Sequence, residues 1–315
     1  MKHTTNDIQT LHTVTEYTRF YDLPAPAHPL LTLIDLGAAN QQAVARGGKG
    51  VHKPVALQLY TVFLKRNLNG LLYYGHRPYD FSEGVMGFSA PGQVFAVDPS
   101  LDTTQVTGWM LVFHPDLLRK YPVSKRIGSY GFFAYAVHEA LHLSEQEEVQ
   151  LGRLLDNLRA ECDRPIDAFS QDVLVGQVDL LLTYADRFYT RQFVTRRSVE
   201  HDRDEGSLLS RFETALTDYF AQETDHPLPT VQFFADKLNV SPAYLSDLLR
   251  ILTGQNTQQH IHHALIEKAK RLLLTTSLSV NETAFQLGFE YPQYFSRLFK
   301  SKTGLSPVAF RFSAQ

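Results

Sequence analysis

Histidine and glutamate side chains in the stretch V-H-E-A-L-H have the spacing of a zinc site. His138, Glu139 and His142 form an H-E-x-x-H motif. On a helix this spacing places both imidazoles on one face, where they can bind zinc while the glutamate acts as a general base. The motif raises the hypothesis of a metalloprotease.

The residues that follow the motif argue against that chemistry. Ser144 and Glu147 form a capping box, which predicts that a helix begins directly after Ser144. His138 and His142 would then lie in extended chain about 13 Å apart, at roughly 3.3 Å per residue, too far to share one metal. Glu161 is a conceivable third ligand, but it falls on a helix whose apolar stripe has a packing role.

The chain contains three further histidines, His260, His262 and His263. They are weak candidates for a metal site, because their spacing suits neither one helical face nor a known zinc pattern. We interpret them as surface or capping residues. We therefore predict no catalytic residue, no metal site and no cofactor.

Composition places the chain among ordinary globular proteins. Its 315 residues suffice for two domains, and 43% are apolar and 20% charged. The single cysteine, Cys162, allows no internal disulfide and fits a reducing compartment. No signal peptide and no run of roughly 18 apolar residues is visible, so we expect a cytoplasmic protein without a membrane segment.

Charge differs slightly between the two ends of the chain. Residues 1–206 hold 20 Lys and Arg against 24 Asp and Glu, and residues 207–315 hold 10 against 9. The difference favours an anionic partner for the C-terminal part only weakly.

Residues 1–143 have the pattern of an antiparallel β sandwich or barrel. The stretches 55–65 and 108–113 are rich in β-branched and aromatic residues, with dense Gly and Pro turn signals between them. Helices are predicted next, over residues 144–193. The first has an apolar stripe consisting of Leu151, Leu154, Leu155, Leu158 and Cys162.

The second helix, about 167–193, is apolar over more than one face. Its stripe contains Leu174, Val178, Leu181, Ala185 and Phe188, and Val173, Leu180 and Leu182 lie beside it. We predict that part of this surface meets a second subunit in a homodimer. The alternative is that the helix packs only on its own β domain. Residues 194–207 are polar and predict a linker, and residues 208–315 are helical throughout.

The C-terminal part contains an internal repeat. Ala235 and Leu238 match Ala284 and Leu287 at an offset of 49. At an offset of 50, Pro242, Tyr244, Ser246, Leu248, Thr253 and Gly254 match Pro292, Tyr294, Ser296, Leu298, Thr303 and Gly304. Repetition at this length indicates two copies of one supersecondary unit.

Each copy has the signals of helix, tight turn and helix. Thr230 and Ser279 stand at N-cap positions, and Pro242 and Pro292 at the first position of the second helices. Gly288 gives its turn conformational freedom, and Gly254 and Gly304 follow the second helices as C-caps. The pattern predicts a duplicated helix-turn-helix, joined by an amphipathic helix over 261–274.

The second helices expose different side chains. At about 100° per residue, Gln293, Ser296, Arg297 and Lys300 lie opposite Phe295, Leu298 and Phe299. Arginine suits guanine, glutamine suits adenine, and lysine suits the phosphate backbone. The matching set in the first copy is Ala243, Ser246, Asp247 and Arg250. Since Asp247 would repel phosphate, a merely solvated polar face stays open for that copy.

Residues 207–312 resemble the DNA-binding domain of the AraC/XylS family of bacterial transcription regulators. The resemblance is carried by I-E-K-A-K-R-L-L-L-T-T-S-L-S-V-N-E-T-A-F-Q-L-G-F and P-Q-Y-F-S-R-L-F-K-S-K-T-G-L-S-P-V-A-F-R. It places the base-contacting positions on Ala243, Ser246, Asp247 and Arg250 and on Gln293, Ser296 and Arg297. Ala243 and Asp247 depart from the expected donors, which puts base reading by the first copy in doubt.

The N-terminal part is similar, less specifically, to the cupin-like sensing domain of this family, with the stretch 79–95 as a strand–turn–strand passage. The whole chain is thus expected to be an α+β protein. It combines a cupin-like domain (1–143), a dimerisation segment (144–193), a linker (194–207) and a double helix-turn-helix domain (208–315).

The resemblance implies a homodimeric regulator that binds promoter or operator DNA, with a small-molecule effector and RNA polymerase as candidate partners. Two alternatives stay open. One is a ligand-independent regulator whose N-terminal domain only dimerises or binds a protein, and the other is an enzyme with a catalytic β domain.

Overall fold

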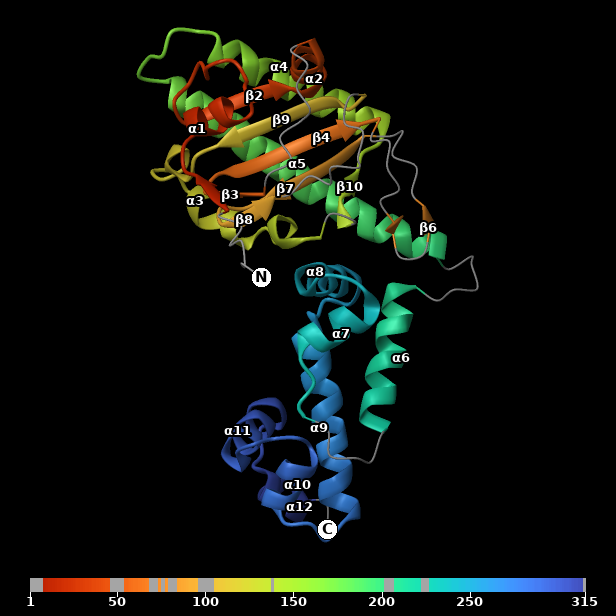
Figure 1. The fold of residues 1–315 in the computed structure, drawn as a ribbon. Coiled ribbons are helices and arrows are strands. Elements are labelled where there is room, and N and C mark those ends of the chain that lie inside the picture. Colours follow the sequence, from red (N-terminus) through yellow and green to blue (C-terminus); the bar gives the residue numbers. More distant parts are fainter. Residues whose placement is uncertain are drawn as a thin grey trace, which may run out of the picture. The chain divides into compact units, whose positions relative to one another are not determined.

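A computed structural model describes residues 8–45, 54–67, 73–74, 77–78, 84–95, 105–136, 139–200, 207–221 and 227–313. The contacts divide the chain into two compact units, Met1–Gln192 and Phe193–Gln315. We call them the N-terminal unit and the C-terminal unit, and Figure 1 labels their elements. Among the described residues, no helix is long and apolar enough to cross a membrane.

Short strands form the sheets of the N-terminal unit. Those described are β1 (Gln9–Leu11), β2 (Leu31–Asp35), β3 (Val55–Leu57), β4 (Tyr60–Arg66), β5 (Tyr73–Tyr74), β6 (Arg77–Pro78), β7 (Val85–Ser89), β8 (Gln93–Phe95), β9 (Thr107–Phe113) and β10 (Leu141–His142). The larger sheet has the antiparallel order β10-β7-β4-β9-β2, the smaller has the order β1-β3-β8, and β5 pairs with β6. The β-rich N-terminal part is therefore confirmed.

The chain passes between the two larger sheets at two tight bends. The stretch 55–65, expected as one strand, is divided into β3 of the smaller sheet and β4 of the larger sheet. The predicted strand–turn–strand passage is present as β7 and β8, with Gly92 at φ 91° before β8. These two strands pair with other strands and not with each other.

One strand pairing differs from the expected antiparallel arrangement. β1 pairs with β3 in parallel. A parallel pair needs a long crossover, which the segment containing α1, β2 and α2 supplies. The described strands form open sheets, so a closed cupin-like barrel stays a prediction.

Helices flank these sheets. They are α1 (Val14–Phe20), α2 (Leu36–Ala45), α3 (Val123–Arg126), α4 (Glu145–Cys162) and α5 (Ser170–Glu200), with 3-10 turns η1 (Pro115–Leu117), η2 (Ile127–Ser129) and η3 (Gly131–Ala134). The sequence patterns did not predict α1 and α2. α1 has only seven residues, and α2 buries none of its side chains, so neither has a clear helical stripe.

The predicted start of α4 is confirmed. The Ser144 backbone N–H donates to the Glu147 carboxylate at 2.9 Å, and the Ser144 hydroxyl accepts from the Glu147 backbone N–H. Four of the five predicted stripe residues are buried, and Cys162 is half-buried. The next helix, α5, continues to Glu200, so the predicted linker 194–207 begins inside it.

Among its described residues the C-terminal unit contains helices and no strands, as predicted, and it begins with the last residues of α5. The helices that follow are α6 (Leu208–Ala221), α7 (Val231–Leu238), α8 (Pro242–Thr253), α9 (Thr257–Thr275), α10 (Val280–Gln286), α11 (Pro292–Thr303) and α12 (Pro307–Ser313). α9 contacts α6 and α8 as well as α10 and α12. Figure 1 shows α7 and α8 at one end of α9 and α10 to α12 at the other.

Candidate nucleic-acid interface

The two turns of the repeat have the same backbone. The Val240 N–H donates to the Ala235 carbonyl and the Phe289 N–H donates to the Ala284 carbonyl, both at 3.0 Å. Each turn contains one left-handed residue, which is Asn239 (φ 56°) in the first copy and Gly288 (φ 87°) in the second. Asparagine tolerates this conformation better than most residues, so it serves where the second copy has glycine.

The second helix of each copy also ends in the same way. Gly254 (φ 77°) and Gly304 (φ 79°) are left-handed C-caps, as predicted. The Thr253 hydroxyl lies 2.7 Å from the Leu249 carbonyl, and the Thr303 hydroxyl lies 2.8 Å from the matching carbonyl one repeat later. The repeat thus includes the start of the helix that follows each copy. Asn256 caps α9, and its counterpart Ser306 accepts a backbone N–H of the first turn of α12.

The outer face of α11 carries unpaired polar side chains. Phe295 and Phe299 are fully buried, whereas Gln293, Arg297 and Lys300 are exposed. Within the described part of the chain, these three polar side chains make no hydrogen bond and no ion pair. The predicted arrangement of this helix is present, except that Ser296 is only half-exposed.

Two tyrosines extend the exposed face of α11 toward its N-terminus. The side chains of Tyr291 and Tyr294 are 49% and 56% exposed, and their rings meet edge to face at 5.9 Å. The repeat aligns Tyr294 with Tyr244, which is buried in the first copy, so the two tyrosines differ in exposure. Tyr291 is the N-cap of α11 and makes no side-chain cap bond, so backbone N–H groups of the first turn lack a side-chain partner.

The outer face of α8 is already engaged. Arg250 Nη1 lies 2.9 Å from Asp247 Oδ1, so the cation is paired within its own helix. The Ser246 hydroxyl lies 3.1 Å from that of Thr257, which is fully buried. Ser246 was predicted to project outward with Ala243. Instead, it bonds inward, because the first turn of α9 lies against this side of α8, which a single-helix projection omits.

Glu139 and His142, the two described residues of the zinc-like motif, have structural roles. The Glu139 side chain is fully buried and accepts the Ala136 backbone N–H at 2.6 Å. His142 lies in β10, and its backbone N–H donates to Gln192. His138 falls outside the described residues. Across the described ranges, no group of three His, Cys, Asp or Glu side chains could hold a metal ion.

The histidines of α9 have packing and hydrogen-bonding roles. His260 Nε2 lies 2.8 Å from the Thr253 hydroxyl, and its ring meets Phe212 edge to face. His262 Nε2 lies 2.8 Å from the side-chain nitrogen of Gln258. Burial lowers the pKa of both histidines, and Lys302 lowers that of His262 further. Such histidines stay neutral and add no charge for an anionic partner.

A helix-turn-helix domain model matches residues 234–312, from the middle of α7 into α12. The chain is 24% identical to the transcriptional activator RhaR of Escherichia coli over 294 residues, which cover 90% of this chain and 97% of RhaR. The match to the curated regulator YfiF of Bacillus subtilis is 28% over 168 residues, 51% of this chain and 49% of YfiF.

The C-terminal unit therefore contains a helix-turn-helix domain of the kind found in AraC-family transcriptional regulators. The chain's alignments span about half of YfiF and 26% of the Bacillus subtilis protein YesN, at 36% identity with YesN. Among solved structures, the chain matches the C-terminal domain of the two-component response regulator YesN from Fusobacterium nucleatum. The identity is 30%, the TM-score is 0.29, and the match covers 32% of this chain and 95% of that one. It also matches the DNA-binding domain of AdpA with target DNA, at 28% identity, a TM-score of 0.29, and coverage of 34% and 90%.

Proposed function

We propose that the chain is a sequence-specific DNA-binding regulator that reads its operator mainly with α11. The observation that carries this proposal is a group of three side chains, Gln293, Arg297 and Lys300, that have no partner among the described residues and lie on a helix anchored by two buried phenylalanines. Arginine and glutamine can form paired hydrogen bonds to guanine and adenine in the major groove. Lysine can bind phosphate, and Ser296 lies at the edge of this set.

The helix α9 supports placement of both copies on one side of a duplex. Its 19 residues span about 28 Å at 1.5 Å per residue. Successive major-groove segments lie about 34 Å apart, so α8 and α11 could enter neighbouring segments. In this proposal α8, which carries Ala243, Ser246, Asp247 and Arg250, helps to position the domain on DNA. It makes fewer base contacts than α11.

The N-terminal unit is proposed to dimerise and to sense a small molecule. Exposed apolar side chains at the start of α5 support dimerisation. Phe169, directly before the helix, is 70% exposed, and Val173 and Leu180 within it are 40% and 43% exposed. Such an apolar surface is a common subunit interface. A ligand would act by binding one domain arrangement more tightly than another. The similarity to RhaR, which is named a transcriptional activator, supports a role in activating transcription. RNA polymerase is then a proposed partner, and the cytoplasm the proposed location.

The alternative is a ligand-independent regulator whose N-terminal unit only dimerises or binds protein. The same exposed side chains of α5 support this alternative equally. Thermal-shift screening of the chain against metabolites separates the two, because only a sensor is stabilised by a specific ligand.

Mobility shifts with the DNA around its own gene test the proposal. The chain should shift this DNA in preference to random competitor at moderate salt. Arg297→Ala should weaken specific binding by about 1–3 kcal/mol and relax discrimination at one base pair. Arg153→Ala, which removes an exposed arginine of α4, should bind as the parent does. If Arg297→Ala binds specific and random DNA like the parent, α11 is not the reading helix.

A further inference from the structure

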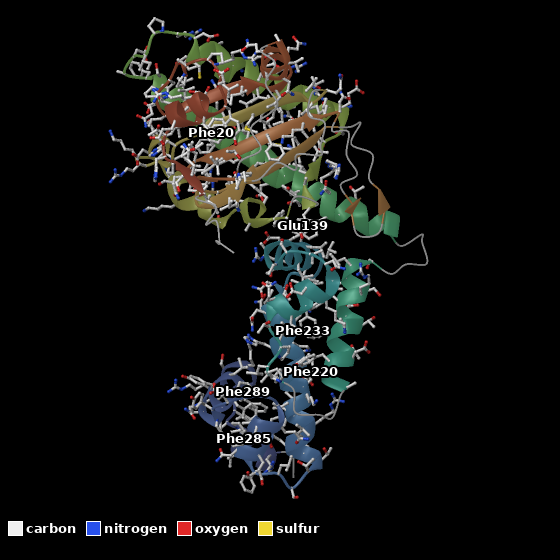
Figure 2. All side chains as sticks on the ribbon, viewed as in Figure 1. Phe20, Glu139, Phe220, Phe233, Phe285 and Phe289 are labelled. Atoms are coloured by element: carbon white, nitrogen blue, oxygen red, sulfur yellow. The ribbon has the colours of Figure 1, made fainter. Side chains whose placement is uncertain are left out.

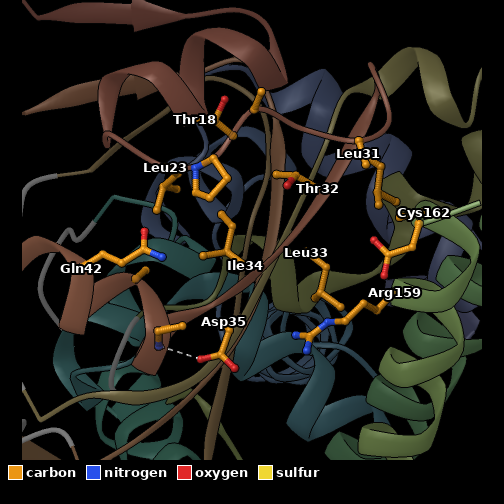
Figure 3. Close-up of a pocket in the computed structure, with 16 residues that line it drawn as sticks. Thr18, Leu23, Leu31, Thr32, Leu33, Ile34, Asp35, Gln42, Arg159 and Cys162 are labelled. Atoms are coloured by element: carbon orange, nitrogen blue, oxygen red, sulfur yellow. Dashed lines mark hydrogen bonds between the residues drawn. The ribbon is translucent and has the colours of Figure 1, made fainter.

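A cavity lies at one edge of the larger sheet in the N-terminal unit. Its volume is about 260 Å³. Its walls are β2, the loop after α1, the first turns of α2 and the C-terminal end of α4, as Figure 3 shows. β2 is the last strand in the sheet order, so one of its sides has no neighbouring strand among the described residues.

The open side of β2 offers main-chain hydrogen bonds to the cavity. The His114 N–H donates to the Leu30 carbonyl at 2.8 Å, and Leu31 faces Phe113 in the register. Antiparallel pairs alternate between bonded and non-bonded, so Thr32 and Ile34 bond β9 while Leu33 points its N–H and carbonyl to the open edge. Neither Leu33 group has a partner in the described part of the chain.

Charged side chains of both signs line the same cavity. Arg159, in the last turn of α4, is exposed and makes no ion pair among the described residues. Asp35 uses one carboxylate oxygen to accept the Ala38 N–H at 3.0 Å, which leaves its second oxygen available. Asp163, the C-cap of α4, adds a second carboxylate at the negative end of that helix.

Apart from Thr18, Thr32 and Gln42, the remaining side chains of the lining are mostly apolar. Leu23, Pro24 and Ala39 stand on the α1 and α2 side of the strand, as Figure 3 shows for Leu23. On the α4 side, burial raises the pKa of the Cys162 thiol to about 11. This cysteine is therefore protonated near neutral pH and forms part of the wall rather than a nucleophile.

We propose that this cavity binds a small carboxylate that also carries an amino or hydroxyl group and a short apolar side chain, the chemistry of a free amino acid. Arg159 would hold the carboxylate and Asp35 the amino or hydroxyl group, while Leu33 supplies one main-chain donor and one acceptor. The apolar side chain would lie against Leu23 and Pro24. The proposal gives a place and a ligand class to the sensing part of the proposed function, on which it rests.

Two other ligand classes fit less well. A simple anion such as phosphate would meet two carboxylates beside the one arginine, and like charges disfavour it. A long peptide would add a strand to β2, but a cavity below the usual 300–1,000 Å³ of ligand sites suits a smaller molecule.

Calorimetric titration of the full chain with a matched set of compounds tests the proposal. The set consists of L-leucine, 2-hydroxy-4-methylpentanoate, L-leucinamide without the carboxylate, and 4-methylpentanoate without the amino group. We expect saturable binding of L-leucine or its hydroxy analogue, and the stronger of the two identifies the source. L-leucinamide and 4-methylpentanoate should each bind at least about tenfold more weakly, because each leaves one charged partner unsatisfied.

Substitutions of lining residues test whether the preferred compound binds in this cavity. Arg159→Gln should raise the Kd for the preferred compound at least about tenfold, since it removes a charge-assisted bond. Asp35→Asn should do the same while still capping α2, because asparagine is an equally good cap. Arg153→Gln, on α4 outside the cavity, should leave the Kd unchanged.

Three results would overturn the proposal. They are no binding by any of the four compounds, equal binding by parent and Arg159→Gln, or tighter binding of tri-leucine than of L-leucine. The titration contains no DNA, so its failure leaves the mobility-shift result standing. A failed mobility shift likewise leaves the ligand site intact.

Discussion

The two helix-turn-helix copies of the C-terminal unit share a backbone and differ in what they present. In both, a left-handed residue makes the turn, a proline opens the second helix and a left-handed glycine closes it. On the outer face of α8, Arg250 is in an ion pair and Ser246 in a hydroxyl hydrogen bond, whereas the exposed polar side chains of α11 have no partner in the part of the chain that the structure describes. The comparison teaches that helix ends and turns specify the motif, while a few outer side chains decide what it can bind.

The copies differ inside as well. The core under α11 is aromatic, with the Phe295 and Phe299 rings 5.7 Å apart and Phe310 5.4 Å from Phe299. The matching positions under α8 hold Leu245 and Leu249, both fully buried. Because each copy packs on a different end of α9, each has its own core. Figure 2 shows the aromatic side chains Phe233, Phe220, Phe289 and Phe285 distributed along the unit.

The largest effect is expected from truncating these cores. Phe299→Ala should cost about 3–5 kcal/mol, and Leu249→Ala about 2–5 kcal/mol, since each leaves a cavity. If the cores are independent, Phe299→Ala should remove amide exchange protection from α10 to α12 and spare α7 and α8. Hydrogen exchange of the full chain measures this. Equal loss of protection in both copies would show that they unfold as one cooperative body.

The arginines at the two outer faces should differ in their contribution to DNA binding. Arg250→Ala should weaken operator binding by less than about 1 kcal/mol, because an exposed arginine already paired with Asp247 gains little from DNA. Arg297→Ala should cost about 1–3 kcal/mol. Titrations against one operator at fixed salt compare them directly. Equal losses would mean that Arg250 leaves its ion pair on binding.

Changes to the shared backbone should affect both copies alike. Gly254 and Gly304 have φ angles of 77° and 79°, and a Cβ added at either would meet no atom within 4 Å. Alanine at either site should therefore cost about 1–2 kcal/mol from backbone strain alone. Chemical denaturation of the two single variants tests this. Unequal costs would reveal a constraint on one helix end that the φ angles do not contain.

The sequence predicted the parts of the fold that depend on neighbouring residues. The capping box at Ser144, the prolines opening α8 and α11 and the glycines closing them are local signals, and each element formed where they stand. Pairings between distant residues were not visible. The division of 55–65 into β3 and β4 and the parallel pairing of β1 follow from sheet contacts far along the chain.

The candidate site was also predictable only where its geometry depends on a single helix. A helical projection placed Gln293, Arg297 and Lys300 together on an exposed face. It failed for Ser246, since the partner Thr257 belongs to another helix. The projection did not include Tyr291 and Tyr294, which are exposed although Tyr244, the counterpart of Tyr294 in the repeat, is buried.

The smallest effect is expected from a substitution that makes the outer face of α8 more like that of α11, with a free cation. Asp247→Asn removes a carboxylate that repels phosphate and releases Arg250, so operator affinity should rise by up to about fivefold, or about 1 kcal/mol. Salt titration of binding measures the gain, which should shrink as salt increases because it is electrostatic.

Two controls decide whether that gain comes from Arg250. Asp236→Asn removes an exposed carboxylate of α7 that bonds Gln232, and it should change affinity less. The double variant Asp247→Asn with Arg250→Ala should lose most of the gain, because no cation is then released. A gain that survives in the double variant would come from lost repulsion alone. The first copy would then be limited by its negative charge and not by the engagement of its arginine.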